Sequence, residues 1–443
     1  MTEPTATSPK KVALQNVGCK LNLYEIEALK SGFGSSGYQV VPFGTEADIY
    51  VINTCTVTGS GDADSRKAVR RARRANPRAT VVATGCYAQR QPDELQNSGA
   101  DLVVGNAQKA DLRQHLEAHL AGTSPVSFDP TVQPRTSGFL QIDGPVEDGR
   151  TRGTLQIQDG CDEHCTYCII PKVRGPGVSR PREQILEQAR SMIDAGYREL
   201  ALTGIHSGSY GNDLEVPGDL VDLLVDLERI DGLERIRLNS VEPAFVSDAL
   251  IDFAASAQKF CRHFHVPLQS GDDRILKLMG RHYTRSYYAE RIERISRLIP
   301  DCAIGADVMV GFPGEGEEEF SNCLSLLTDL PVTYLHVFSF SLRSGTPAAR
   351  LKDHQTNKTK KERAHRLIQL SQEKRLAFHQ RFLGRSLEVL VEGRRDPASN
   401  LCVGLSDNYI KTLLPGEEGM ENELLPVFVE RAREDLVFAE REE

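Results

Sequence analysis

Apolar runs of strand length alternate with helix-length periodic segments over two long stretches of the chain, and this alternation limits the fold more than any other feature. In the first stretch the predicted strands are 12–17, 48–53 and 80–84, and the predicted helices include 22–29 and 64–75. Alternating strands and helices are typical of a parallel sheet with helices on its faces. We therefore predict an α/β protein whose residues 10–122 form an N-terminal open parallel-sheet domain.

The second stretch lies beyond residues 123–150, which are rich in Pro, Ser, Thr and Gly and are predicted to be a linker. Its predicted strands are 154–158, 199–203, 235–239, 263–267, 303–310 and 334–340, and helical patterns lie between them. Six strand–helix units suit a central partial (βα)6 TIM-like barrel over residues 151–383. In such barrels the site lies at the carboxyl ends of the strands.

The tail changes character after a long charged helix predicted at 359–382. Short apolar runs at 387–391, 408–413, 424–429 and 436–439 are separated by glycines and charged turns. This spacing predicts a small C-terminal all-β barrel over residues 384–440.

Composition places the chain among ordinary globular proteins, with 443 residues and a net charge of −9. No segment has the apolar length of a signal peptide or a membrane span, so we expect a cytoplasmic protein without a membrane partner. Thiols stay reduced in that compartment, and the ten cysteines are therefore expected to be ligands or core residues and not disulfides. The negative charge argues against a uniformly basic surface but leaves room for a local basic face.

Cys19, Cys55 and Cys86 each follow one of the first three predicted strands. Carboxyl ends of parallel strands share one edge of a sheet, so the fold would bring these thiols together. A single cysteine in such a place is more often a small core residue, but three at equivalent strand ends favour a shared site. Gly18 and Gly85 are expected to let the backbone approach a bulky ligand there. The structural cysteines are expected to be Cys261, Cys302, Cys323 and Cys402.

Cys161, Cys165 and Cys168 form a C-x3-C-x2-C motif directly after the first predicted barrel strand. Three closely spaced thiolates suit a 4Fe–4S cluster with one iron free of protein ligands, whereas a ferredoxin motif would supply a fourth cysteine. A zinc loop is the alternative, although structural zinc prefers four ligands.

The C-x3-C-x2-C motif, with Tyr167 before its last cysteine, resembles the signature of the radical-SAM superfamily. Within it, the chain resembles the methylthiotransferases from Val12 to about Ala439. The matching stretches, in order, are Gly18 to Asn22, Asn53 to Cys55, Gly85–Cys86, Cys165 to Pro171, Pro267 to Gly271 and Gly311 to Glu315. That family joins a three-cysteine N-terminal domain, a radical-SAM barrel and a C-terminal TRAM barrel.

The resemblance implies two 4Fe–4S clusters and no catalytic residues beyond their ligands. Cys161, Cys165 and Cys168 would bind the cluster that cleaves S-adenosylmethionine to a radical. The other three thiols would bind an auxiliary cluster that delivers sulfur, and a second S-adenosylmethionine would act as methyl donor. Candidate S-adenosylmethionine contacts at the barrel edge are Tyr167, Gly204, Ser240, Glu242, Gln269 and Asp307, each of which also fits a loop, packing or capping role. The family often has a basic residue where Val178 stands, which weakens a phosphate-binding role for that loop, although Arg174 and Arg180 remain.

Residues 66–78 hold seven basic residues and no acidic one. The alternative to RNA contact is a solvated helix surface, but acidic residues would usually be interspersed there, so we favour a basic stripe for RNA. Its predicted members are Arg66, Lys67, Arg70, Arg71, Arg73 and Arg74.

The motifs around Cys19 and Cys55 most resemble the branch that acts on N6-threonylcarbamoyladenosine at position 37 of tRNA. A tRNA anticodon loop and a low-potential electron donor such as flavodoxin or ferredoxin are the implied partners. The alternatives are the isopentenyladenosine branch, methylthiolation of a ribosomal-protein aspartate, and a non-enzymatic iron–sulfur RNA-binding protein or redox sensor.

Overall fold

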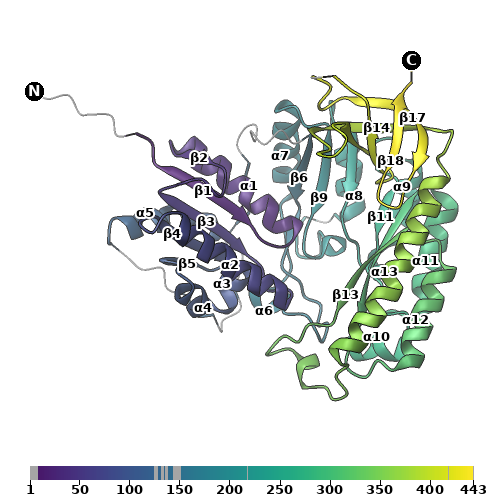
Figure 1. Ribbon diagram of the computed structural model, residues 1–443, viewed down its shortest axis with the longest axis horizontal. Coiled ribbons are helices and arrows are strands. Elements are labelled where there is room, and N and C mark those ends of the chain that lie inside the picture. The colour runs from purple at the N-terminus through teal and green to yellow at the C-terminus, as the bar shows by residue number, and fades with distance from the viewer. Residues whose placement is uncertain are drawn as a thin grey trace, which may run out of the picture. The chain divides into compact units, whose positions relative to one another are not determined.

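The computed structural model describes residues 8–123, 128–130, 134, 138–142, 151–216, 218–417 and 419–442. The chain forms two compact units (Figure 1). Among the described residues, the first unit contains those up to 142 with 159–163 and 168–180, and the second contains 151–158, 164–167 and those from 181. Most of the predicted linker, 123–150, lies outside the described residues.

A five-stranded parallel sheet in the order β2-β1-β3-β4-β5 forms the centre of the first unit. Its strands are β1 (Lys11–Asn16), β2 (Gln39–Val41), β3 (Ile49–Thr54), β4 (Thr80–Gly85) and β5 (Leu102–Val104). Every residue of β3 is buried, which explains why its sequence is a nearly continuous apolar run.

Helices cover both faces of this sheet (Figure 1). They are α1 (Lys20–Ser35), α2 (Gly59–Ala75), α3 (Cys86–Arg90), α4 (Pro92–Asn97) and α5 (Leu112–Leu120), with a 3-10 turn at Lys109–Asp111. Apolar side chains of α1 and α5 share a core with Val82, while those of α2, α3 and α4 share a core with Val81 and Ala83. The alternation along β4 therefore sends successive residues into opposite cores.

A segment from farther along the chain belongs to the first unit as well. It contains α6 (Ile170–Arg174) and β8 (Val178–Ser179), and β8 pairs with the short strand β7 (Gln158–Asp159). Helix α6 packs on α3, where Val173 and Ile169 contact Cys86 in a small apolar cluster. Residues just after the C-x3-C-x2-C motif are thus part of the N-terminal unit.

The second unit contains two three-stranded parallel sheets, in the orders β10-β9-β6 and β11-β12-β13. The strands are β6 (Arg152–Gln156), β9 (Glu199–Thr203), β10 (Arg235–Leu238), β11 (His263–His265), β12 (Ala303–Val310) and β13 (Tyr334–Ser339). Single bridges from Ile236 to Phe260 and from Ser240 to His265 continue the order across the two sheets. The predicted partial barrel is confirmed.

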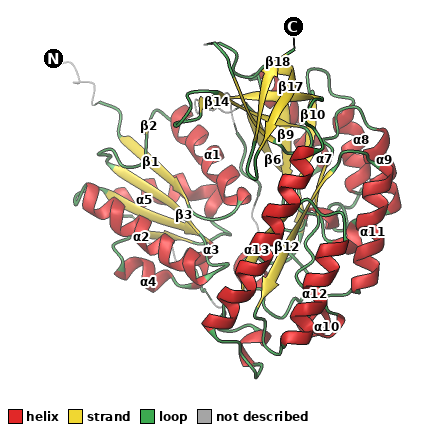
Figure 2. Ribbon diagram, turned by 45° about the vertical axis from the view of Figure 1, so that its right-hand side comes forward, coloured by secondary structure: helices red, strands yellow, loops and turns green. Residues whose placement is uncertain are grey.

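Helices surround these strands on the outside (Figure 2). They are α7 (Arg182–Asp194), α8 (Leu220–Glu228), α9 (Asp248–Ser256), α10 (Asp273–Met279), α11 (Arg285–Leu298), α12 (Glu317–Asp329) and α13 (Asn357–Gln380), with 3-10 turns at Ser207–Ser209, Pro243–Phe245 and Pro347–Arg350. The apolar faces of all these helices except α10 form one large core with the strands. Ile275 and Met279 of α10 pack instead in a smaller cluster with Phe312 and Phe340. Among the helices of the described residues, none combines the length and apolar character needed to cross a membrane.

The C-terminal part of the second unit is a closed barrel in the order β14-β15-β16-β18-β17. Its strands are β14 (Ser386–Arg395), β15 (Cys402–Ser406), β16 (Lys411–Leu414), β17 (Leu424–Ala432) and β18 (Val437–Arg441). Phe378, near the end of α13, and Phe382, two residues after it, are buried with the barrel's core residues. The predicted all-β C-terminal barrel is confirmed.

Candidate functional site

Three cysteines lie at one edge of the first unit's sheet. Cys19 caps α1 after β1, Cys55 follows β3, and Cys86 begins α3 after β4. Because β1, β3 and β4 are adjacent parallel strands, the loops after them meet at one edge. A Cβ atom on Gly18, next to Cys19, would stand 2.7 Å from Cys55 Sγ, so these two loops pack closely.

The two glycines of this edge make room for protein atoms. Gly18 has φ +102° and Gly85 has φ +96°, a region that other residues rarely adopt. A Cβ atom on Gly85 would stand 2.4 Å from Asn53 Oδ1, and one on Gly18 would stand 2.6 Å from Cys55 Cβ. The glycines therefore allow the cysteine-bearing loops to pack against one another, and the approach of a ligand along their backbone stays a prediction.

The pKa values of the Cys55 and Cys19 thiols are both raised. Burial raises the pKa of Cys55 to about 12, and Cys86 and Cys19 add to that shift. Desolvation by surrounding protein also raises the pKa of Cys19, although part of that residue is exposed to solvent; Arg174 opposes the shift and Cys86 reinforces it. Such thiols become thiolates when a metal centre displaces their protons.

The donor set of Cys19, Cys55 and Cys86 fits a 4Fe–4S cluster better than a single metal ion. Tetrahedral zinc would draw sulfur ligands to roughly 3.8 Å from one another, given Zn–S bonds of about 2.3 Å. In the described part of the chain, the one group of three ligands whose atoms all lie within 4.8 Å is His265, Asp307 and His336, so these thiols are spread more widely. A cubane with three cysteine ligands and one open iron suits that spread.

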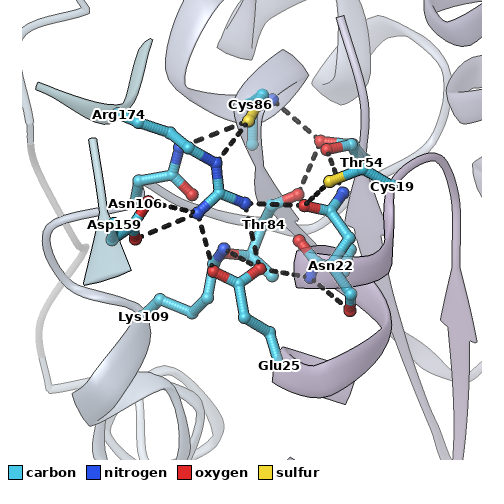
Figure 3. Close-up of polar contacts among 12 residues, drawn as sticks. Cys19, Asn22, Glu25, Thr54, Thr84, Cys86, Asn106, Lys109, Asp159 and Arg174 are labelled. Carbon is cyan, nitrogen blue, oxygen red and sulfur yellow. Dashed lines mark hydrogen bonds and ion pairs between the residues drawn. The ribbon is translucent and has the colours of Figure 1, made fainter. Parts of the chain in front are cut away.

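Arg174, the last residue of α6, lies beside Cys86, and Asn22 connects it to Cys19 (Figure 3). Its Nε donates to Cys86 Sγ at 3.3 Å, and its Nη2 donates to Asn22 Oδ1 at 2.7 Å. Asn22 Oδ1 is in turn 3.7 Å from Cys19 Sγ. Arg174 is only 2% exposed, so the guanidinium is a buried cation next to the thiols.

Two carboxylates hold this buried guanidinium. Its Nη1 donates to Asp159 Oδ1 and Oδ2 at 2.9 and 3.0 Å and to Glu25 Oε1 at 3.0 Å. Burial would lower the pKa of Arg174, but Asp159, Cys86 and Glu25 outweigh it and hold the pKa well above its ordinary value. Arg174 therefore stays charged.

Glu25 connects this cation to a second one. Its Oε2 accepts from Lys109 Nζ at 2.6 Å and from Asn53 Nδ2 at 2.7 Å. Burial would raise the pKa of Glu25, but Arg174 and Lys109 outweigh it and lower the pKa to about 2. The network thus joins two basic residues, Arg174 and Lys109, to two acidic ones, Glu25 and Asp159.

Cys161, Cys165 and Cys168 lie in the loop between β7 and α6, and each is half-buried. In the first unit, Cys161 N donates to Gly175 O at 3.1 Å. Gly160 has φ +69°, and a Cβ atom there would stand 1.8 Å from Pro176 O, so only glycine fits before Cys161.

Within the second unit, the middle of the loop is attached to the end of α10. Thr166 N donates to Met279 O and Thr166 Oγ1 donates to Leu278 O, both at 2.8 Å. Arg281 Nη1 donates to Cys165 Sγ at 3.2 Å. The loop is therefore held by hydrogen bonds while its three cysteines are only half-buried, as binding of a cluster and a cofactor requires.

Three of the predicted S-adenosylmethionine contacts lie near this loop or after barrel strands. Tyr167 packs edge-on against Phe312, with ring centroids 6.4 Å apart. Gly204 follows β9, and a Cβ atom there would stand 3.0 Å from Gln158 Oε1. Glu242 forms an ion pair with Arg281, the residue that donates to Cys165.

The other three predicted contacts lie around β11 and β12. Ser240 forms a bridge with His265, and Gln269 has φ +64° with its N donating to Asp307 O at 2.8 Å. Asp307 Oδ1 lies 2.8 Å from His265 Nε2 and 3.3 Å from His336 Nδ1. Burial would raise the pKa of Asp307, but these histidines outweigh it and lower the pKa below its usual range.

The predicted basic stripe lies on α2, but its six residues differ in their surroundings. Arg66 is half-buried and bonds Tyr87 and Glu94, and Arg73 donates to Gly99 O at 3.0 Å and pairs with Asp101. The exposed members are Lys67, Arg70, Arg71 and Arg74. A four-residue exposed basic face is therefore what the helix presents to solvent.

Arg174 and Arg180 are both buried, and their hydrogen bonds go to protein groups. Arg180 Nη1 donates to Tyr24 OH at 3.1 Å. Neither side chain is on the surface where a substrate phosphate would meet it. Sequence reasoning also missed the roles of Glu25, Lys109 and Asp159, because no local spacing connects residues so far apart in the chain.

Two family models match the chain. Residues 11–105 match "Uncharacterized protein family UPF0004", and residues 155–327 match the radical SAM superfamily. The threonylcarbamoyladenosine tRNA methylthiotransferase MtaB of Bacillus subtilis (strain 168) is 39% identical over 425 residues, which covers 95% of this chain and 94% of that protein. The chain belongs to the radical-SAM methylthiotransferase family.

Another methylthiotransferase branch is also similar to this chain. The tRNA-2-methylthio-N(6)-dimethylallyladenosine synthase of Desulfitobacterium hafniense (strain Y51) is 33% identical over 441 residues, or 98% of this chain and 97% of that protein. Among solved structures, the radical S-adenosylmethionine methyltransferase TsrM from Kitasatospora setae aligns with a TM-score of 0.58 at 16% identity over 77% of both chains. At that identity the likeness concerns the fold alone.

As a radical-SAM methylthiotransferase, the protein is an enzyme whose cofactors are two 4Fe–4S clusters and S-adenosylmethionine. This sets aside the zinc loop and the non-enzymatic sensor among the alternatives from sequence. The closed C-terminal barrel is consistent with the TRAM barrel of the family.

Proposed function

We propose that this enzyme converts N6-threonylcarbamoyladenosine at position 37 of tRNA, next to the anticodon, to its 2-methylthio derivative. The observation that carries the proposal is the 39% identity to the Bacillus subtilis MtaB over 95% of the chain. The MtaB of Aquifex aeolicus (strain VF5) supports it, with 41% identity over 86% of the chain.

The second candidate substrate is the dimethylallyl- or isopentenyladenosine of the other tRNA branch. It is favoured by the 33% identity to the Desulfitobacterium hafniense synthase, which extends over 98% of the chain. A ribosomal-protein aspartate is a third candidate, for which the basic face of α2 would have to meet ribosomal RNA or an acidic surface.

Mass spectrometry of tRNA nucleosides from a strain that lacks the gene separates these candidates. We expect threonylcarbamoyladenosine to accumulate without its 2-methylthio form and a plasmid copy of the gene to restore that form. Loss of the methylthio group from the isopentenyl nucleoside would instead support the second candidate, and an unchanged nucleoside profile would refute both tRNA proposals.

We assign Cys161, Cys165 and Cys168 to the radical-SAM cluster and Cys19, Cys55 and Cys86 to the auxiliary cluster. When bound, the first cluster supplies the electron that cleaves S-adenosylmethionine and the second carries the sulfur to be inserted. Arg281 orients Cys165 through its hydrogen bond, and the ion pair with Glu242 orients Arg281. The chain's own residues thus fix the sulfur ligands in place.

The S-adenosylmethionine contacts are also part of the proposal. Tyr167, next to Cys168, offers an aromatic face to the adenine, and Gly204 leaves room for the methionine carboxylate. The remaining proposed contacts are Ser240, Glu242, Gln269 and Asp307. Equilibrium dialysis with S-adenosylmethionine tests this assignment, since Gly204→Val should weaken binding. The control is Gly34→Ala, which should not weaken it, because Gly34 has no positive φ and nothing lies within 4 Å of its Cβ position.

The exposed face of α2 is the proposed contact for the tRNA backbone. Lys67, Arg70 and Arg74 are exposed and lie on a helix with no acidic residue after Asp64. Replacement of Lys67, Arg70 and Arg74 together by Glu should weaken tRNA binding. It should also reduce the dependence of that affinity on salt, because fewer phosphates would be neutralised. Unchanged affinity in a filter-binding titration would assign the face to solvent alone.

We further propose three functional domains, at residues 10–122, 151–383 and 384–440, with the linker at 123–150 between the first two.

The enzyme would act in the cytoplasm, where tRNA is modified and where a low-potential donor such as flavodoxin or ferredoxin supplies electrons. Reduction of the purified protein by either donor would support that partner.

A further inference from the structure

The hydrogen bond from Arg174 to Cys86 is an unusual use of a buried arginine. Arg174 belongs to α6, only six positions after Cys168 in sequence, yet it is 88 residues from Cys86, whose sulfur it contacts. The packing of Val173 and Ile169 against Cys86 keeps α6 in this place. The chain therefore returns to the N-terminal unit and leaves a cation at the auxiliary site.

All three nitrogens of the Arg174 guanidinium donate hydrogen bonds. Nε donates to Cys86 Sγ, Nη1 to Asp159 and Glu25, and Nη2 to Asn22 and Glu25. A planar fork with fixed donors can satisfy this set, whereas the single ammonium of lysine cannot. The carboxylates thus orient the fork so that its Nε–H is directed at the sulfur.

The charges of this network bear on the reduction potential of a cluster bound by the three cysteines. Glu25 and Asp159 already balance Arg174 and Lys109, so the network needs no thiolate to neutralise it. A cluster bound to three thiolates becomes more negative by one charge on reduction. Hydrogen bonds to ligand sulfurs and nearby charge are among the factors that set the potential of such clusters.

We propose that Arg174 is a positioning residue that raises the reduction potential of the auxiliary cluster by donating a hydrogen bond to the sulfur of Cys86. The inference rests on the proposed assignment of Cys19, Cys55 and Cys86 to that cluster. Through Asn22, the same guanidinium orders the side chain next to Cys19. Arg174 acts on the cluster through its ligands and need not touch the substrate.

Lys109 provides a matched control for charge. It is buried in the same network, and its side chain donates a hydrogen bond to Glu25 at 2.6 Å and not to sulfur. Lys109→Gln and Arg174→Gln therefore remove the same charge from one network, and only the second removes the sulfur hydrogen bond. Arg174→Lys keeps the charge and loses the fork.

The test uses the full chain with Cys161, Cys165 and Cys168 all replaced by Ala, so that the auxiliary cluster alone gives a signal. A redox titration followed by electron paramagnetic resonance gives its midpoint potential. We expect Arg174→Gln to lower the reduced-to-oxidised ratio at a fixed potential about tenfold, which for one electron is about 59 mV. Arg174→Lys should recover part of this loss, and Lys109→Gln should shift the ratio less than Arg174→Gln.

Iron content separates failure of the inference about Arg174 from failure of the cluster assignment. An unchanged potential in Arg174→Gln with about four irons per chain would overturn the inference while leaving the cluster assignment intact. If Arg174→Gln does not retain iron, the midpoint potential of Arg174→Lys is the deciding measurement. A midpoint potential equal to that of the parent protein in Arg174→Lys would mean that Arg174 has a structural role only. If the triple-cysteine background itself binds no cluster, the assignment of the N-terminal cysteines fails, and the inference fails with it.

Discussion

Each unit of the protein contains a buried arginine beside a buried cysteine, and the two pairs differ in what surrounds the sulfur. In the first unit Arg174 contacts Cys86. In the second unit Arg237 of β10 influences Cys261, whose pKa burial raises to about 12 while Arg237 opposes the rise. A buried arginine next to a thiol therefore does not by itself identify a metal site.

The surroundings of Arg237 explain its structural role. It donates to Glu199 Oε1 at 2.6 Å and to the carbonyl oxygens of Ser406 and Asp407 at 3.0 and 2.9 Å. These bonds attach the C-terminal barrel to the strands of the second unit. Among the groups that shift the pKa of Cys261 in the described chain there is no second thiol, whereas Cys55 feels two. Convergence of thiols distinguishes the candidate cluster site from the structural pair.

The largest difference is expected when each cysteine is removed. Cys86→Ala should reduce iron by about four atoms per chain and abolish the methylthio product, because two thiols do not hold a cubane. Cys261→Ala should keep the iron and the product, at a stability cost of ~1–2 kcal/mol for lost packing. Iron analysis and nucleoside mass spectrometry measure both, and a Cys261→Ala protein without clusters would remove the distinction.

The carboxylates of the two networks provide the next comparison. Glu199→Gln leaves buried Arg237 without its ion-pair partner and should cost ~3–5 kcal/mol of stability without altering the spectrum of either cluster. Glu25→Gln should cost about 3 kcal/mol at pH 7, because the pKa of Glu25 is lowered from 4.5 to about 2. Both losses of stability can be measured by urea unfolding of the cluster-free protein. Hydrogen exchange in α1 reports on the Glu25 network, and exchange in β10 reports on the Glu199 network.

The pH dependence of the Glu25→Gln cost follows from the direction of the shift. A carboxyl whose folded pKa is lowered stabilises the fold above its unfolded pKa, and this stability is lost as pH falls toward the folded value. The cost of Glu25→Gln should therefore fall to about 2 kcal/mol near pH 3.5 and vanish below pH 2. A cost that is equal at pH 7 and pH 3.5 would mean that Glu25 is not held by Arg174 and Lys109.

A smaller effect is expected at the glycines that let the thiols converge. Gly18→Ala would place a methyl group 2.7 Å from Cys55 Sγ and should displace that ligand, with a loss of roughly half of the auxiliary iron. Gly37→Ala, at φ +82° with nothing within 4 Å, shares the backbone strain of ~1 kcal/mol without the clash and should retain full iron. Equal iron in both variants would show that crowding at Gly18 does not position Cys55.

Strand-end cysteines are visible in the sequence because each follows an apolar run, and parallel topology then fixes their common edge. The bounds of the strands at 199–203 and 303–310 were predicted to the residue, because these strands too are apolar runs. Strands β2, β5 and β15 are absent from the prediction, since the first two have three residues each and β15 contains Gly404 and Ser406 within a short run. In strands this short, the alternation of apolar and polar residues is too weak to predict a strand.

The partners of Arg174 could not be predicted from the sequence. Glu25 is 149 positions away and Cys86 is 88 positions away, and no periodicity relates them. In the sequence, Val178 weakens a phosphate-binding role for the loop of Arg174 and leaves the arginine itself as a candidate, whereas tertiary packing buries the side chain. Long-range electrostatics of this kind become visible only once α6 is placed against α3.

The most direct test of two three-cysteine cluster sites is an anaerobic assay that counts two products of one reaction. Reconstituted Cys19→Ala/Cys55→Ala/Cys86→Ala protein, given dithionite, S-adenosylmethionine and tRNA, should still release 5′-deoxyadenosine but form no methylthio nucleoside. The protein with Cys161, Cys165 and Cys168 replaced should form neither. Methylthiolated tRNA from the first variant would contradict the assignment of Cys19, Cys55 and Cys86 to sulfur delivery.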